Sequence, residues 1–226
     1  MKKIILSIII SIFLNTSLSS HIDHYKSFTS LEYELFRNNK LIGFHNYNFS
    51  RNKDLLTVKS NIVFKISKLG VDLYSYKAES EENYKNDIFY SFKSNTNQNK
   101  KIKYVNIKKK EANTINIDGS SFKGIVSSDF IVGTWWNHEI VKAKAQISAL
   151  SGRVIEQKVT FIGNEVVEIG GKTFNTLRFN FSSSDVSLPD KKKLNTDIWY
   201  DEKNLMWVKA SFVKSGNWEY RIKNYK

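Results

Sequence analysis

The chain has 226 residues, carries a formal charge of +13 and contains no cysteine. The absence of cysteine excludes a disulfide framework and lipid attachment at a lipobox, so burial alone must hold the fold together. Nucleic acid is a poor partner for this charge, because only five of the 35 basic residues are arginine, the residue that reads phosphates and guanines in a bidentate manner.

The N-terminus has the order of residues that is typical of a signal peptide. Lys2 and Lys3 precede an apolar run over residues 4–14, and small polar residues follow up to Ser20. A retained membrane anchor is the alternative, but a run of about a dozen apolar residues is shorter than the roughly 20 that span a bilayer. We expect cleavage after Ser19 or Ser20.

Cleavage at this point divides the chain into a signal peptide at residues 1–20 and a single β-rich domain at 21–226. About 200 residues are enough to bury a substantial core. We therefore expect a periplasmic or secreted protein with no transmembrane anchor after signal cleavage.

The first half of the mature chain has the alternating pattern of β-strands. Residues 31–35 and a return strand from Ile42 are separated by a turn at 38–40, which predicts a hairpin. Further strands follow in the same style, and the spacing is that of a meander: 56–66, 71–79, 88–94, 101–108 and 112–117.

The segment at 120–150 interrupts this pattern. Ser127 could cap a short helix, so we expect a helical crossover around 127–145. Strands then resume on either side of Gly170 and Gly171, the strongest hairpin signal in the chain, because a tight primed turn needs positive φ. The remaining strands bring the expected total to about eleven: 154–162, 165–169, 172–181, 194–200, 205–213 and 217–222.

Six short motifs carry a resemblance to an uncharacterised family of exported bacterial proteins, known as a domain of unknown function. They are LEYEL at 31–35, KLIG at 40–43, GTWWN at 133–137, SGRV at 151–154, IWYD at 198–201 and LMWV at 205–208. More distantly, the strand-rich plan is similar to the half-barrels that carry lipoproteins across the periplasm. The resemblance implies a mainly all-β fold in which a curved antiparallel meander forms a half-barrel or barrel. It implies a role in the cell envelope and supplies no catalytic residue.

Five aromatic residues are candidates for a ligand-binding wall, because concave sites favour aromatic lining. They are Phe130, Trp135, Trp136, Trp199 and Trp207. The simpler interpretation makes the first three a plug that closes one end of a barrel. It makes Trp199 and Trp207 a packed pair that flanks the turn at 201–204.

Other polar residues give weaker signals. His45 and His138 lack a nucleophile motif, and Glu79, Glu81 and Glu82 are explained by turn solvation as well as by glycoside chemistry. Lysines at 108–110 and 191–193 could contact an anionic envelope surface or simply favour solubility. A free N-terminus near His21, Asp23 and His24 could bind copper or nickel, but a frayed N-terminal tail is the simpler interpretation. We assign no catalytic residue, metal or cofactor.

The leading hypothesis is therefore an exported protein that binds an apolar or amphipathic ligand, such as a lipid, on the concave face of a β half-barrel. One alternative is a structural or assembly factor that acts through protein contacts, which predicts a filled barrel. A weaker alternative is an envelope hydrolase, which predicts that a histidine lies within hydrogen-bond reach of Ser, Thr or a carboxylate in a cleft.

Overall fold

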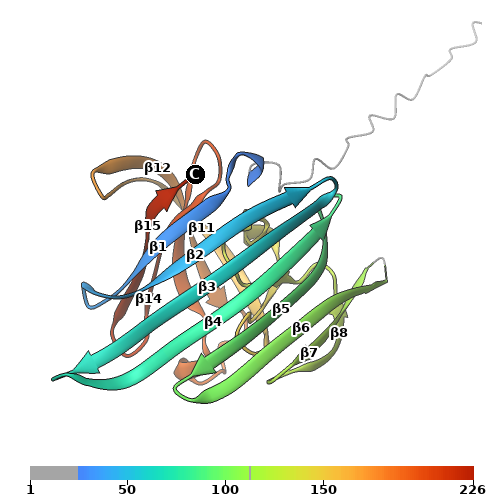
Figure 1. Cartoon of the computed structure of the whole chain (residues 1–226), viewed down its shortest axis with the longest axis horizontal. Coiled ribbons are helices and arrows are strands. Elements are labelled where there is room, and N and C mark those ends of the chain that lie inside the picture. The colour runs from blue at the N-terminus through green and yellow to red at the C-terminus, as the bar shows by residue number, and fades with distance from the viewer. Residues whose placement is uncertain (1–24, 112) are drawn as a thin grey trace, which may run out of the picture.

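One curved sheet of fifteen strands makes up most of the part of the chain that the computed structural model describes, residues 25–111 and 113–226 (Figure 1). Its strand order is β8-β7-β6-β5-β4-β3-β2-β1-β15-β14-β13-β12-β11-β10-β9. This confirms the predicted β meander. The predicted signal peptide at residues 1–20 lies outside the described residues. Within those residues, no helix is long and apolar enough to cross a membrane.

The first eight strands form an antiparallel meander in chain order. Long strands dominate it, and β3 and β4 remain paired from Leu55–Lys85 to Lys68–Val71. The bounds are β1 Ser30–Arg37, β2 Lys40–Asn52, β3 Leu55–Lys68, β4 Val71–Lys85, β5 Ile88–Gln98, β6 Lys101–Glu111, β7 Thr114–Gly119 and β8 Lys123–Ser127.

The C-terminal strands return to the first one, because β15 pairs with β1 in an antiparallel arrangement. Only β9 and β10 pair in parallel among the described strands. The bounds are β9 Ile131–Val132, β10 Ala145–Ile147, β11 Val154–Ile169, β12 Lys172–Ser183, β13 Asn195–Asp201, β14 Trp207–Val213 and β15 Asn217–Tyr225, with short 3-10 helices η2 His138–Lys142 and η3 Asp190–Lys192.

Asparagine and glycine residues explain the tight turns between neighbouring strands. Asn38 and Asn39 have φ of 50° and 60°, and Gly170 and Gly171 have φ of 57° and 76°. Two consecutive residues of positive φ make the primed turn whose twist matches that of the flanking strands, and asparagine and glycine adopt this conformation at low cost. Both predicted hairpins are thereby confirmed.

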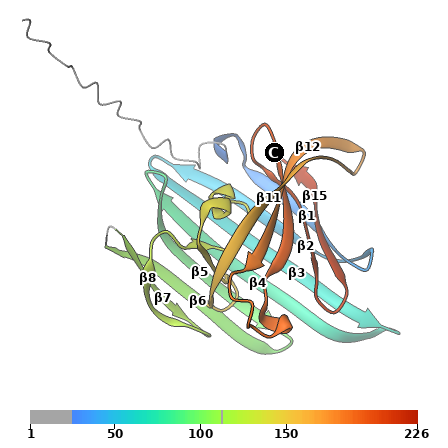
Figure 2. The same cartoon turned by 180° about the vertical axis from the view of Figure 1, so that it is seen from behind.

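The expected helical crossover is only partly correct. Residues 130–136 are not helical: β9 covers Ile131–Val132, and Trp135 has a φ of 60°. Helical structure is limited to η2, which Asn137 caps by accepting a hydrogen bond from the backbone N–H of Glu139. Tertiary contacts override the local helix signal here. The segment runs inside the curved sheet (Figure 2), and its backbone carbonyls at 134 and 135 accept hydrogen bonds from Tyr47 and Tyr200 of the sheet.

Two further differences concern strand length. The predicted strands at 154–162 and 165–169 are one strand, β11, with an irregularity between Phe161 and Gly163. The short strands β8, β9 and β10 were not predicted, because two to five residues carry too little alternation to be recognised.

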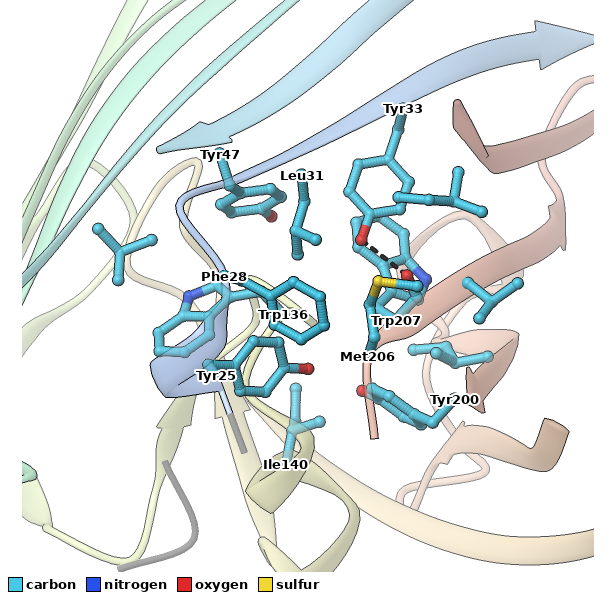
Figure 3. Packing of buried hydrophobic residues seen from close by; sticks show 14 of the residues in the cluster. Tyr25, Phe28, Leu31, Tyr33, Tyr47, Trp136, Ile140, Tyr200, Met206 and Trp207 are labelled. Carbon is cyan, nitrogen blue, oxygen red and sulfur yellow. Dashed lines mark hydrogen bonds between the residues drawn. The ribbon is translucent and has the colours of Figure 1, made fainter. Parts of the chain in front are cut away.

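The core lies between the N-terminal strands, the C-terminal strands and the crossing segment, which we define as residues 128–153. Aromatic side chains from all three meet there, and Figure 3 shows Trp136, Tyr47 and Trp207 among them. A smaller apolar cluster joins β5, β6 and β7 to β9 and β10 of the crossing segment. The crossing segment therefore connects the two halves of the sheet from within.

Candidate functional site

A cavity of about 370 Å³ lies between the crossing segment and the inner face of β2 to β5. We call it the inner cavity. Its lining combines one polar wall with one aromatic and aliphatic wall. The lining residues are His45, Tyr47, Ser60, Ile62, Tyr76, Ala78, Glu79, Ser80, Ser94, Gly133, Thr134, Trp135, Gln146, Ser148, Ala149, Leu150, Ile155, Lys214 and Tyr220.

The polar wall follows from strand alternation. In β3, residues 56, 58, 60, 62 and 64 face inward, and Ser60 lies among buried or half-buried neighbours on that face. Ser80 of β4 and Ser94 of β5 lie directly across from one another in the sheet. Because these inward positions carry serine instead of valine or leucine, the wall leaves space and offers hydroxyl groups.

Trp135 forms the opposite wall. Its ring makes edge contacts with Trp207 at 5.4 Å and Tyr220 at 5.7 Å, and its carbonyl accepts a hydrogen bond from the Tyr200 hydroxyl at 3.0 Å. The indole N–H is buried and has no hydrogen-bond partner among the described residues. A half-buried ring with an unused donor is suited to hold a ligand that has both apolar and accepting atoms.

A second cavity of about 420 Å³ adjoins the first one, and we call it the outer cavity. The two share Trp135, Ile155 and Lys214. Arg153 and Lys193 also line the outer cavity, together with Asp190, which pairs with Lys193 at 2.9 Å. The combined site is therefore apolar along Trp135 and positively charged toward its outer end.

A buried hydrogen-bond network holds Trp135 in place through its neighbours. The Glu82 carboxylate accepts bonds from the Tyr84 hydroxyl at 2.5 Å, from Trp136 Nε1 at 2.9 Å and from Thr134 Oγ1 at 3.2 Å. The Tyr47 hydroxyl donates to the Thr134 carbonyl at 2.5 Å. Burial raises the pKa of Glu82, although the three donors oppose this effect. The network ties residues 134 and 136 to β2 and β4.

His45 and Ser60 form a close pair on the polar wall, with 2.8 Å between Nε2 and Oγ. His45 Nδ1 is buried, and no residue in the described part of the chain forms a hydrogen bond with it. Burial lowers the pKa of His45 to about 3, so the imidazole is neutral at physiological pH. The pair meets the distance condition of the hydrolase hypothesis, but no carboxylate of residues 25–111 or 113–226 orients the ring as in a catalytic triad.

The structure brings together only some of the predicted site residues. Trp135 lines both cavities, while Trp136 and Trp207 are fully buried beside it in the core. Phe130 packs against the smaller cluster of β5 to β7. Trp199 lies on the outer face of β13, where Arg178 and Lys209 stack on its ring, each at 4.8 Å. Trp199 and Trp207 are on opposite sides of the sheet, because the register shifts between Trp199, which lies opposite Lys209, and Tyr200, which lies opposite Trp207.

The three glutamates occupy strand β4 and not a turn, so the turn interpretation is wrong. Glu82 faces inward and is 2% exposed, whereas Glu81 is half-buried and ion-paired with Lys59 at 3.8 Å, and Glu79 is exposed. Alternation explains the split: Glu82 shares its face with Ala78 and Tyr84. The alternation of β4 is the sequence signal that places Glu82 inward, and Glu82 was not predicted as a site residue.

Within residues 25–111 and 113–226, no group of three or more His, Asp or Glu side chains is arranged to hold a metal ion. His21, Asp23 and His24 lie outside the described residues. Of the two lysine clusters, 108–110 lies on β6, and Lys193 reaches the outer cavity.

Residues 33–223 match a protein-family model described as "Domain of unknown function (DUF6134)". This match confirms the predicted resemblance to an uncharacterised family. No curated protein matches the chain in sequence.

Two solved structures are similar to this chain at low sequence identity. A β-barrel-like protein of a domain of unknown function, DUF1849, from Brucella abortus superposes with a TM-score of 0.61 at 13% identity, and the alignment covers 87% of this chain and 96% of that one. A Bacteroides fragilis protein with a YmcC-like fold gives a TM-score of 0.37 at 10% identity over 87% and 94% of the two chains. The first similarity confirms the barrel-like architecture.

Proposed function

We propose, since this chain belongs to the DUF6134 family of unknown function, that it is an exported envelope protein that holds an apolar or amphipathic ligand in the inner cavity. The single observation that carries the proposal is the open volume behind Trp135, where a curved sheet of this size could have been filled by side chains. A structural factor with a filled barrel has no use for such a space. The charged, apolar and small-residue order of residues 1–20 supports export.

The size and lining of the site favour an amphipathic ligand. Two adjoining volumes of about 370 and 420 Å³ fall within the range of about 300 to 1,000 Å³ of typical small-molecule pockets. Trp135, Ile155 and Tyr220 offer apolar surface for a chain or ring. The serine hydroxyls and the unpaired Trp135 N–H offer hydrogen bonds at fixed points, which set orientation.

Positive charge at the outer end favours an anionic head group. Arg153 donates to the Lys192 carbonyl at 3.3 Å, which holds the guanidinium beside the outer cavity. Lys214 lines both cavities. A fatty acid or an anionic lipid would place its chain along Trp135 and its head group between these two cations.

Filling the inner cavity should abolish this binding. Ala78 faces the cavity from β4, so Ala78→Trp places an indole in the space of the ligand. We expect the affinity for a fluorescent fatty acid, measured by titration, to fall at least about tenfold, the effect of losing roughly 1.4 kcal/mol of contacts. Protein purified from the periplasm should also release a lipid or acyl compound on denaturation, identified by mass spectrometry.

Lys77→Trp provides the matched control, because Lys77 is the exposed neighbour of Ala78 on the same strand. This variant should bind the probe like the native protein. Equal affinities of native protein and Ala78→Trp, or a periplasmic protein without any bound compound and without affinity for the probe, would contradict the proposal.

A hydrolase is the second candidate, favoured by the 2.8 Å contact of His45 and Ser60 in a cavity. It is the weaker one, because a base with a pKa of about 3 lies far from the range near the operating pH that general-base catalysis requires. Ester hydrolysis that disappears in Ser60→Ala, with the fold intact, would reverse this order.

A further inference from the structure

Five connections meet at one end of the half-barrel, and we call this end the loop rim. They are the turns at 38–39, 69–70, 99–100 and 214–216 and the loop at 184–194. Asn38 N donates to the Asn217 carbonyl at 2.8 Å, which holds the turn at 38–39 beside the start of β15, and Asn99 N donates to the Ser75 carbonyl at 2.8 Å, which holds the turn at 99–100 against β4. Figure 1 shows the β3–β4, β5–β6 and β14–β15 connections projecting at the lower end.

The most exposed large apolar side chains of the described residues gather on this rim. They are Leu69 at 95%, Val186 at 83%, Val213 at 79% and Ile102 at 71% exposed. The residues beside the turns at the opposite end are less exposed: Ile88, next to the turn at 86–87, is 56% exposed, and Leu55, next to the turn at 53–54, is 37% exposed. The turns at 38–39, 99–100 and 214–216 are themselves polar, so the apolar character of the rim comes from Leu69, Val186 and the strand ends at Ile102 and Val213.

Leu69 is unfavourable at its position for two independent reasons. Its φ is 50°, in the left-handed region that glycine, asparagine and aspartate adopt at lower cost than leucine. Its side chain is also almost fully in water. Neither feature stabilises the fold, and asparagine occupies the equivalent place in the 38–39, 86–87 and 99–100 turns. A partner that buries Leu69 would account for both features.

Exposed lysines stand next to three of these four apolar residues. Lys68 precedes Leu69, Lys101 precedes Ile102 and Lys214 follows Val213, and all three are exposed. Of the rim carboxylates, Asp72 is paired with Lys65 at 2.7 Å and Asp190 with Lys193 at 2.9 Å. A third, Asp185, precedes Val186 and accepts hydrogen bonds from the backbone N–H of Ser187 at 2.8 Å and from its hydroxyl at 2.6 Å. The lysines beside the apolar tips therefore give the rim a positive surface.

We propose that the loop rim docks onto an anionic lipid bilayer, with Leu69 and its apolar neighbours inserted at the head-group boundary and the flanking lysines on the lipid phosphates. Apolar tips with adjacent cations suit such a surface, because insertion and attraction to anionic lipid act together. A protein partner is less suited, since the apolar residues stand on separate turns and do not form one continuous packed patch. Lys214 also lines both cavities, so docking turns their opening toward the membrane.

Vesicle co-sedimentation tests the docking. The mature protein should pellet with vesicles of phosphatidylglycerol and phosphatidylcholine and much less with phosphatidylcholine alone. Leu69→Ser should lower the partition coefficient about tenfold, as expected for a leucine that leaves an apolar environment. Lys68→Ser and Lys101→Ser should each lower it about fivefold, and added salt should weaken binding.

Val166→Ser is the matched control, because Val166 is 63% exposed on β11 near the opposite end. It should pellet like the native protein. The proposal fails if the native protein does not pellet with anionic vesicles, if Leu69→Ser pellets equally well, or if the rim crosslinks to a protein without binding vesicles. Ala78→Trp should still dock, so failure of docking and failure of ligand binding are separable.

Discussion

Replacing Trp136 with alanine is expected to lower the free energy of unfolding by about 4 to 6 kcal/mol, which exceeds half of the stability of many domains. Trp136 is fully buried, and its ring makes edge contacts with Tyr25 at 5.2 Å, Phe49 at 5.4 Å and Tyr84 at 5.7 Å. The substitution removes a large side chain and also leaves the buried Glu82 carboxylate without its indole donor. Urea unfolding followed by far-ultraviolet circular dichroism measures the loss.

The polar part of this effect can be separated from the packing part. Trp136→Phe keeps an aromatic ring but removes the N–H donor, and Glu82→Gln places an amide where three donors converge. The amide of that glutamine brings N–H donors to a site where Tyr84, Trp136 and Thr134 all donate to the carboxylate. The two variants should therefore couple in a double-mutant cycle by about 1 kcal/mol or more. Strict additivity, or an alanine variant as stable as the native protein, would show that the network does not hold the crossing segment.

The strands were predictable because each carries its own signal. Alternation places Leu31, Tyr33 and Leu35 on one face of β1, and paired residues with positive φ at Gly170 and Gly171 fix a hairpin without any long-range information. The crossing segment was not predictable in the same way. Its local pattern favours a helix after Ser127, but its backbone finds partners on Tyr47 and Tyr200, which are far away in sequence. Such contacts are absent from a local pattern.

Some residues of the candidate site also carry a local sequence signal, whereas others depend on long-range contacts. Trp135 could be proposed from the sequence, since it lies beside Trp136 and Phe130 in the segment that lacks strand alternation. The inward positions of His45, Ser60 and Glu82 required a strand register, because a one-residue shift would exchange the two faces. Glu82 was hidden for a further reason. Two adjacent glutamates, Glu81 and Glu82, suggest that both side chains are exposed to solvent. The burial of Glu82 is tolerated because Tyr84, Trp136 and Thr134 donate hydrogen bonds to its carboxylate.

Acidification should destabilise the protein through His45. The folded-state pKa of about 3 lies below the ordinary value of 6.5, so the unfolded chain binds a proton first as the pH falls. Stability is therefore fully present above about pH 6.5 and is lost progressively toward pH 3. Between pH 7 and pH 4 the loss from this residue is on the order of 3 kcal/mol. Chemical denaturation at a series of pH values, compared between native protein and His45→Phe, measures it.

The comparison between the two proteins isolates His45 from groups of opposite sign. Burial raises the pKa of Glu82, so that residue contributes stability at low pH which is lost as the pH rises, and it partly offsets His45 in the native curve. Both proteins contain Glu82 and the same surface carboxylates, so these contributions cancel in the difference. His45→Phe should be less stable than the native protein at pH 7, because Ser60 loses its partner, and should gain on it steadily as the pH falls. A difference that stays constant from pH 7 to pH 4 would mean that His45 becomes protonated in the folded state, and the cavity wall would then carry a positive charge at acidic pH.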